Sequence, residues 1–163
     1  MSRRFIALWP PDEVLDAVEA LHRPTELGGR WTRRDQWHVT LRFLGDVDLE
    51  PVVAALEGVG SGPVPARFGP TVERLGAGVL HVPVSGLDEL ADEVVERTRN
   101  LGRPPEDRPF LGHLTLARMA GRPPEGVLGQ PIAGEWTVDA VHLVGSHLGG
   151  TAARYETEAT IRL

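Results

Sequence analysis

Two short histidine–threonine motifs have the clearest chemical potential in this sequence. They are His38-Val39-Thr40-Leu41 and His113-Leu114-Thr115-Leu116. Alternate side chains of a β-strand share a face, so each motif predicts an imidazole and a hydroxyl on one side and apolar residues on the other. One such motif is common by chance. Two copies at matching places in a weak internal repeat predict two lobes that share one functional cleft.

Paired histidines and threonines suit the cleavage of a phosphodiester without a metal. An unperturbed imidazole has a pKa of about 6.5, so near neutral pH one copy can be neutral while the other is protonated. The neutral ring can act as a general base on water, and the protonated ring as a general acid for the leaving ribose oxygen. The hydroxyls of Thr40 and Thr115 can bind nonbridging phosphate oxygens. These residue types leave open whether His38 or His113 is the acid.

Two arginines are candidates for contact with the phosphate. Arg42 has the parity of His38 and Thr40 in the first motif strand, so it is predicted to face the phosphate, with a structural salt bridge as the alternative. Arg118 follows His113 by five residues, which places it on the opposite face of a regular strand. A β-bulge would return Arg118 to the cleft.

Other side chains are weaker candidates. His81 is the most plausible additional histidine, and His147, beside a glycine-rich turn, is an alternative lining residue. A metal site needs three or four convergent ligands, and no carboxylate cluster accompanies the motif histidines, which disfavours a two-metal nuclease. We therefore expect neither a metal nor another cofactor. Phe43 is predicted to lie in the core, whereas Phe110 either stacks on a nucleobase or packs internally.

Composition excludes several classes of function. The chain has 163 residues, 17 basic and 23 acidic side chains, a formal net charge of -6 and 0 Cys. This length predicts a single domain, residues 1–163, built from two pseudo-repeat lobes. The absence of cysteine excludes disulfides, thiolate zinc sites and cysteine nucleophiles, and the absence of lysine excludes an adenylylated lysine, a Schiff base and a P-loop. The acidic balance argues against nonspecific coating of long nucleic acids.

Hydrophobic periodicity predicts the elements that hold the two motifs. We expect strands at 4–9, 37–44, 67–75, 79–84, 113–119, 136–144 and 155–163, and helices at 11–22, 49–59 and 87–101. Glycines at 76 and 78 predict a hairpin turn, and Gly149-Gly150 predicts the turn between the last two strands. The apolar run from Phe5 to Trp9 is too short for a signal peptide or a membrane span of about 20 residues, so we expect a cytoplasmic protein without membrane contact.

These features together resemble the 2H phosphoesterase superfamily. More closely, the chain resembles the bacterial and archaeal RNA 2′,3′-cyclic phosphodiesterases, also called the 2′-5′ RNA ligase family. The likeness covers nearly the whole chain in order. Its matching stretches are Arg30-Trp31, Trp37 to Gly45, Arg108-Pro109-Phe110, His113 to Arg118, and Ala153-Arg154-Tyr155-Glu156.

The resemblance implies a fold, a reaction and residue roles. The fold is α+β and bilobal, with two antiparallel sheets and flanking helices around a pseudo-two-fold cleft. The reaction is the hydrolysis of an RNA 2′,3′-cyclic phosphate to a 2′-phosphate, with His38 as proton donor and His113 as proton acceptor. Thr40, Thr115, Arg42 and Arg118 are then the residues that bind substrate. The implied partner of this monomeric enzyme is an RNA end, such as that of a tRNA fragment, or a small cyclic nucleotide.

Alternatives and departures remain at this stage. The same two histidines also suit a small cyclic phosphate of the nucleotide or ADP-ribose type, reversible 2′-5′ ligation without ATP, or a noncatalytic RNA-end-binding protein. Members of the family often have Arg-Pro before the second motif, where this chain has Leu111-Gly112, and often an aromatic residue where it has His81. These departures concern substrate preference rather than the motif chemistry.

Overall fold

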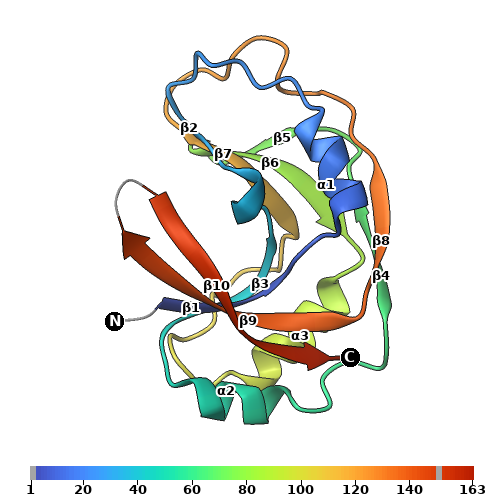
Figure 1. Cartoon of the computed structure of the whole chain (residues 1–163), viewed down its shortest axis with the longest axis vertical. Coiled ribbons are helices and arrows are strands. Elements are labelled where there is room, and N and C mark those ends of the chain that lie inside the picture. Colours follow the sequence, from blue (N-terminus) through green and yellow to red (C-terminus); the bar gives the residue numbers. More distant parts are fainter. Residues whose placement is uncertain (1–2, 150–151) are drawn as a thin grey trace.

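The first half of the sheet is built around the N-terminal strand. The structure is a computed structural model that describes residues 3–149 and 152–163. The apolar N-terminal segment forms β1 (Arg3–Leu8), which lies between β9 (Ala140–Gly149) and β3 (Val39–Asp46), with β10 (Ala152–Arg162) outside β9. All these pairs are antiparallel. In Figure 1 they form the lower part of the sheet, and β10 curves across it.

The second half of the sheet contains the second motif. Its strands, in spatial order, are β7 (His113–Met119), β6 (Val79–Ser85), β4 (Val64–Phe68) and β8 (Gly134–Val138). Two short strands lie beside this order: β2 (Gly29–Trp31) pairs with β7, and β5 (Glu73–Leu75) pairs with β6. The turn between β5 and β6 is the predicted hairpin over glycines 76 and 78.

The two halves meet at the centres of the two motifs. Val39 of β3 pairs with Leu114 of β7, and this pairing joins the halves into one curled antiparallel sheet. The α+β class with an antiparallel sheet is therefore confirmed, although the halves form one continuous strand order rather than two separate sheets. Both side chains at the junction are fully buried, so the apolar centre of each motif also contributes to the core.

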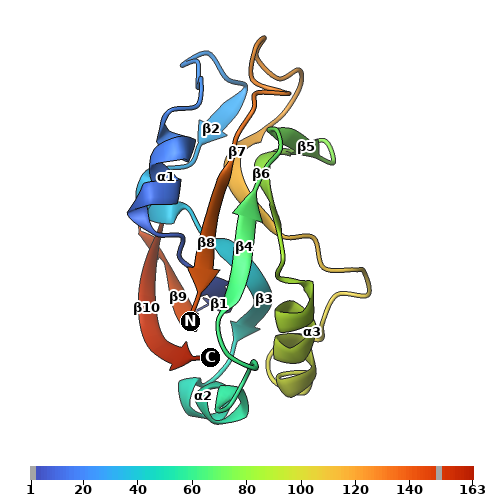
Figure 2. The ribbon, with the colours of Figure 1, turned by 90° about the vertical axis from the view of Figure 1, so that its right-hand side faces the viewer.

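Three α-helices cover the described part of the sheet. They are α1 (Asp12–Glu19), α2 (Leu49–Leu56) and α3 (Asp88–Arg97), and a 3₁₀ turn, Arg34–Gln36, precedes the first motif. Each helix buries an apolar stripe at helical spacing, such as Leu90, Ala91 and Val94 in α3. Figures 1 and 2 show α2 and α3 together at one end of the molecule and α1 beside β8. Among the described residues, no helix is long and apolar enough to cross a membrane.

Two predicted strands are wrong because backbone breaks divide them. The segment 67–75 divides at Gly69-Pro70, where a Cβ on Gly69 would lie 2.2 Å from the carbonyl oxygen of Ile132. The segment 136–144 divides at Asp139 into β8 and β9, which lie in different halves of the sheet. The predicted turn at Gly149-Gly150 lies partly outside the described residues.

Candidate active site

One cavity brings the two motifs together. It has a volume of about 800 Å³ and is lined by His38 and Thr40 from β3 and the β3–β2 side, and by His113, Thr115 and Arg118 from β7. Because β3 and β7 are antiparallel and pair at the central residue of each motif, each histidine lies across from the threonine of the other strand. Five of the six predicted site residues therefore line one cleft.

Both motif strands contain an extra residue directly after the threonine. Opposite β1, the pairing passes from Thr40 to Arg42 and omits Leu41. Opposite β6, it passes from Thr115 to Ala117 and omits Leu116. A β-bulge of this kind turns the following residues to the other face. The same irregularity thus occurs at the same place in each motif.

The two bulges decide which residues face the cleft. In β7 the bulge returns Arg118 to the cavity wall, as the predicted alternative required. In β3 it brings Phe43 to the wall, where the side chain is 40% exposed, so the prediction that Phe43 lies in the core is wrong. Phe43 and Arg118 each follow their motif histidine by five residues and occupy equivalent places.

The prediction that Arg42 faces the phosphate is corrected by the same bulge. Arg42 is absent from the residues that line the cavity and is only 5% exposed. Its Nη2 donates hydrogen bonds to the carbonyl oxygens of Thr98 (3.2 Å), Leu101 (3.1 Å) and Arg103 (2.8 Å). Nη1 donates to the carbonyl of Phe43 at 3.0 Å and Nε to the hydroxyl of Thr98 at 3.3 Å. Arg42 therefore holds the segment after α3, not substrate.

His38 lies among aromatic rings. The ring centroids of Phe5, Trp9 and Tyr155 are 5.0, 5.7 and 5.2 Å from that of His38. The Nδ1 of His38 lies 2.6 Å from the carbonyl oxygen of Gln36, so Nδ1 carries the proton and donates it, and Nε2 lies 2.9 Å from the Thr40 hydroxyl. Burial, with smaller contributions from His113 and Arg118, lowers the pKa of His38 to about 4.

His113 has the same backbone anchor in a different environment. Its Nδ1 lies 2.7 Å from the carbonyl oxygen of Leu111 and therefore donates to it. The ring lies 5.4 Å from the ring of His81, which is 3% exposed and lies behind the cavity wall. Burial and the proximity of His113 lower the pKa of His81, against the opposing effect of Glu73. His81 Nε2 is 3.7 Å from Glu73 Oε2, and His81 Nδ1 is buried without a hydrogen-bond partner.

The departure at Leu111-Gly112 has a packing reason. A Cβ on Gly112 would lie 2.3 Å from the carbonyl oxygen of Val84, and the amide of Val84 donates to the carbonyl of Gly112 at 2.9 Å. This close approach of β6 requires glycine directly before the second motif. Leu111 is 52% exposed, and only its carbonyl takes part in the anchoring of His113.

The cavity wall includes residues to which the motif analysis gave no role. Tyr155 of β10, Phe5 of β1 and Thr32 after β2 line it with the histidines. Burial raises the pKa of Tyr155, and Arg118 opposes that rise, so the phenol stays neutral. These residues come from strands far from the motifs in sequence, and only the sheet order reveals their proximity. The charged residues among those that line the cavity in the described chain are Arg3, Arg30 and Arg118.

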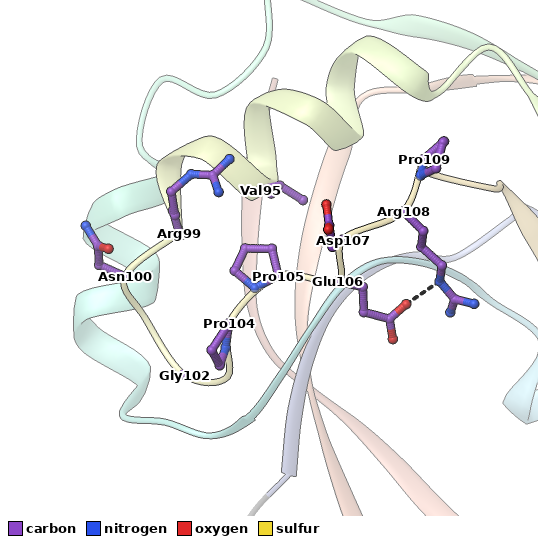
Figure 3. Close-up of a pocket in the computed structure, with 10 residues that line it drawn as sticks. All are labelled: Val95, Arg99, Asn100, Gly102, Pro104, Pro105, Glu106, Asp107, Arg108 and Pro109. Carbon is purple, nitrogen blue, oxygen red and sulfur yellow. Dashed lines mark ion pairs between the residues drawn. The ribbon is translucent and has the colours of Figure 1, made fainter.

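Other candidates lie outside this cavity. His147 is exposed and pairs with Glu156 at 3.4 Å, and Phe110 packs against the core. A second hollow of about 870 Å³ lies between the end of α3 and the proline-rich segment 102–109 (Figure 3). It contains the Arg108–Glu106 ion pair and none of the predicted site residues. Within residues 3–149 and 152–163, no three His, Asp or Glu side chains are grouped to hold a metal ion.

A curled antiparallel sheet with a His-x-Thr strand on each side of one cleft defines a two-histidine phosphoesterase. Comparison with known proteins agrees, because the family model LigT like Phosphoesterase matches residues 8–76, which include the first motif. A crystal structure of a phosphoesterase superposes with a TM-score of 0.83 and 25% sequence identity, over 99% of this chain and 98% of that one. The chain belongs to the LigT-like 2H phosphoesterases.

Two curated relatives are RNA 2′,3′-cyclic phosphodiesterases. The protein from Geobacillus stearothermophilus is 30% identical over 149 residues, which are 82% of this chain and 47% of that protein. The protein from Aeropyrum pernix is 34% identical over 103 residues, which are 53% of this chain and 55% of that protein. The chain thus spans about half the length of these curated relatives.

Proposed function

We propose that this chain hydrolyses RNA 2′,3′-cyclic phosphate ends to 2′-phosphate ends, without a metal. The observation that supports this most is the single cavity that holds both His-x-Thr motifs, in which the charged lining residues of the described chain are all arginines. In a protein with a net charge of -6, this local excess of positive charge favours an anionic substrate. The names of the two curated relatives support the same substrate class.

The proposed reaction moves two protons. His113 Nε2 accepts a proton from water, whose oxygen attacks phosphorus, and His38 Nε2 donates a proton to the 3′ oxygen as the P–O3′ bond breaks. Both Nδ1 atoms donate to backbone carbonyls, which leaves both Nε2 atoms for the cleft. Thr40, Thr115 and Arg118 bind the nonbridging oxygens, where negative charge accumulates in the transition state.

His38 must acquire its proton together with the substrate. Burial lowers the pKa of His38 to about 4, so the ring is neutral at pH 7 in the free protein. An anionic phosphate in the cavity favours the imidazolium and raises this pKa. The aromatic rings around His38 also favour a cation over a bare apolar surface. The substrate thereby supplies the charge that makes His38 an acid.

The decisive test is turnover without metal. The protein is incubated, in the presence of EDTA, with a short RNA that ends in a 2′,3′-cyclic phosphate, and the product phosphate is located on the 2′ or 3′ oxygen. We expect a 2′-phosphate, and a loss of about 10²–10⁴-fold in kcat for His38→Ala and for His113→Ala. His147→Ala, an exposed histidine outside the cavity, is the matched control and should keep full activity.

The other outcomes assign the alternatives. Turnover of a mononucleotide cyclic phosphate but not of RNA would identify a small-molecule phosphoesterase. Joining of a 5′-hydroxyl RNA to the cyclic phosphate without ATP would show the reverse reaction. Binding of the RNA end by a protein with no turnover on any of these substrates would refute the enzyme and leave an RNA-end-binding protein.

A further inference from the structure

Thr32 lies directly after β2 and hydrogen-bonds to both sides of the bulge in β7. Its backbone N–H donates to the carbonyl oxygen of Leu116 at 2.8 Å. Its hydroxyl lies 2.8 Å from the carbonyl oxygen of Thr115 and 2.9 Å from that of Leu116. These two carbonyls belong to the bulged residue and to the one before it. A single side chain thus binds the backbone at the point where β7 changes its face.

The same hydroxyl also binds the entrance of the first motif. It accepts a hydrogen bond at 2.9 Å from Nε1 of Trp37, which directly precedes His38 and is 1% exposed. The hydroxyl proton of Thr32 is shared between two carbonyls, and one lone pair is taken by the indole. The chain Trp37–Thr32–Leu116 therefore connects the backbone beside His38 with the backbone that follows Thr115.

We propose that Thr32 is a positioning residue that holds the two catalytic strands in register, an inference that rests on the proposed function. The bulge at Leu116 determines that Arg118, rather than Ala117, faces the cavity. Two bonds to that bulge fix its geometry, and the third fixes its place relative to His38. Thr32 acts through the strands, although its side chain also lies in the cavity wall.

Matched substitutions separate the hydroxyl from the shape of the side chain. Thr32→Val keeps the branched shape and removes the hydroxyl, whereas Thr32→Ser keeps the hydroxyl. We expect Thr32→Val to lower kcat by about 10–100-fold with little change in KM, because small displacements of catalytic groups reduce rates strongly. Thr32→Ser should retain most of the activity. A rise in KM at unchanged kcat would overturn the proposal, since it would mean that the hydroxyl binds substrate directly.

A second pair of variants controls for stability. Thr32→Val leaves the buried indole N–H of Trp37 without an acceptor, which costs about 1–3 kcal/mol. The double variant Thr32→Val with Trp37→Phe removes that unpaired donor. We expect the double variant to recover stability but not kcat. If kcat returns with stability, Thr32 is merely structural and the proposal is wrong.

Amide hydrogen exchange in the free protein tests the positioning role without reference to turnover. We expect Thr32→Val to accelerate exchange at residues 32 and 115–119, and to leave β1 unchanged. If the wild-type protein has no turnover but this acceleration occurs, the proposed function fails while the connection through Thr32 holds. Unchanged exchange together with wild-type kcat in Thr32→Val would refute the positioning role itself.

Discussion

The two motif strands share a backbone design and differ in the side chains around it. Each of β3 and β7 anchors its histidine Nδ1 to the carbonyl two residues earlier, and each is bulged directly after the threonine. Yet the residue that the bulge turns into the cleft is Phe43 in one strand and Arg118 in the other. The repeat therefore supplies the geometry twice, and single residues at equivalent places give the two sides different chemistry.

The strands are also held by different means. In β3, Arg42 points away from the cleft, and its guanidinium holds the backbone that follows α3. In β7, the alanine at the equivalent position, Ala117, has no such side chain, and Thr32 from outside the strand binds the bulge instead. Equal bulges do not need equal anchors, because any donor that reaches the freed carbonyls can satisfy them.

The largest expected effect is on the anchor of β3. Arg42→Met should lower the free energy of unfolding by on the order of 3 kcal/mol, because it leaves several backbone carbonyls without their donor. For a chain of this size each kcal/mol shifts Tm by about 2–4 °C, which calorimetry measures readily. Arg99→Met is the control, since Arg99 makes an exposed ion pair with Glu96, and it should change stability little. An equally small effect of Arg42→Met would contradict the anchoring role.

The equivalent cleft positions should respond differently to the same substitution. Arg118→Met removes a charged donor from the proposed phosphate site and should lower kcat/KM by about 10–100-fold. Phe43→Met removes an apolar contact of similar size and should lower it by less than about 10-fold. Steady-state kinetics on an RNA cyclic phosphate compares them directly. Equal losses at both positions would show that charge is not what distinguishes the two sides.

The histidines should be distinguished by their response to an anion. In the free protein the ring of His38 should protonate only as the pH falls through about 4, because burial lowers its pKa. Inorganic phosphate in the cavity should raise that pKa, so that the bound protein takes up a proton near neutral pH. Histidine NMR titration with and without phosphate, assigned with His38→Asn, measures this. A ring that stays neutral with phosphate bound would reverse the two roles.

The smallest expected effect is behind His113. His81→Phe keeps an aromatic ring and removes the buried, unpaired Nδ1, so it should raise the free energy of unfolding by about 1 kcal/mol. The ion pair lost with the half-exposed Glu73 contributes little. Urea denaturation measures the change, with His81→Ala as the destabilising counterpart. A loss of stability in His81→Phe would show that the nitrogen has a partner that the geometry does not reveal.

Period and spacing predicted much of this molecule and failed at the bulges. The two motifs, the strand His113–Met119 and the helix after Pro11 follow from local patterns. Alternation then predicted Arg42 in the cleft and Phe43 in the core, and both were wrong because a bulge adds one residue to the count. A bulge depends on pairing with a distant strand, here β1, and no local pattern in 38–43 indicates it. Tyr155 and Thr32 were missed for the same reason, because only the strand order brings them to the cavity.

The carbonyl anchors of the two histidines have a consequence for how this site tolerates change. In many enzymes a carboxylate orients the imidazole, and one substitution can remove it. Here the acceptors are the main-chain oxygens of Gln36 and Leu111, which every residue at those positions would supply. The tautomer of each ring is therefore insensitive to the identity of its neighbour. Because a carbonyl has no net charge, it also orients the ring without adding a fixed anion beside a phosphate substrate.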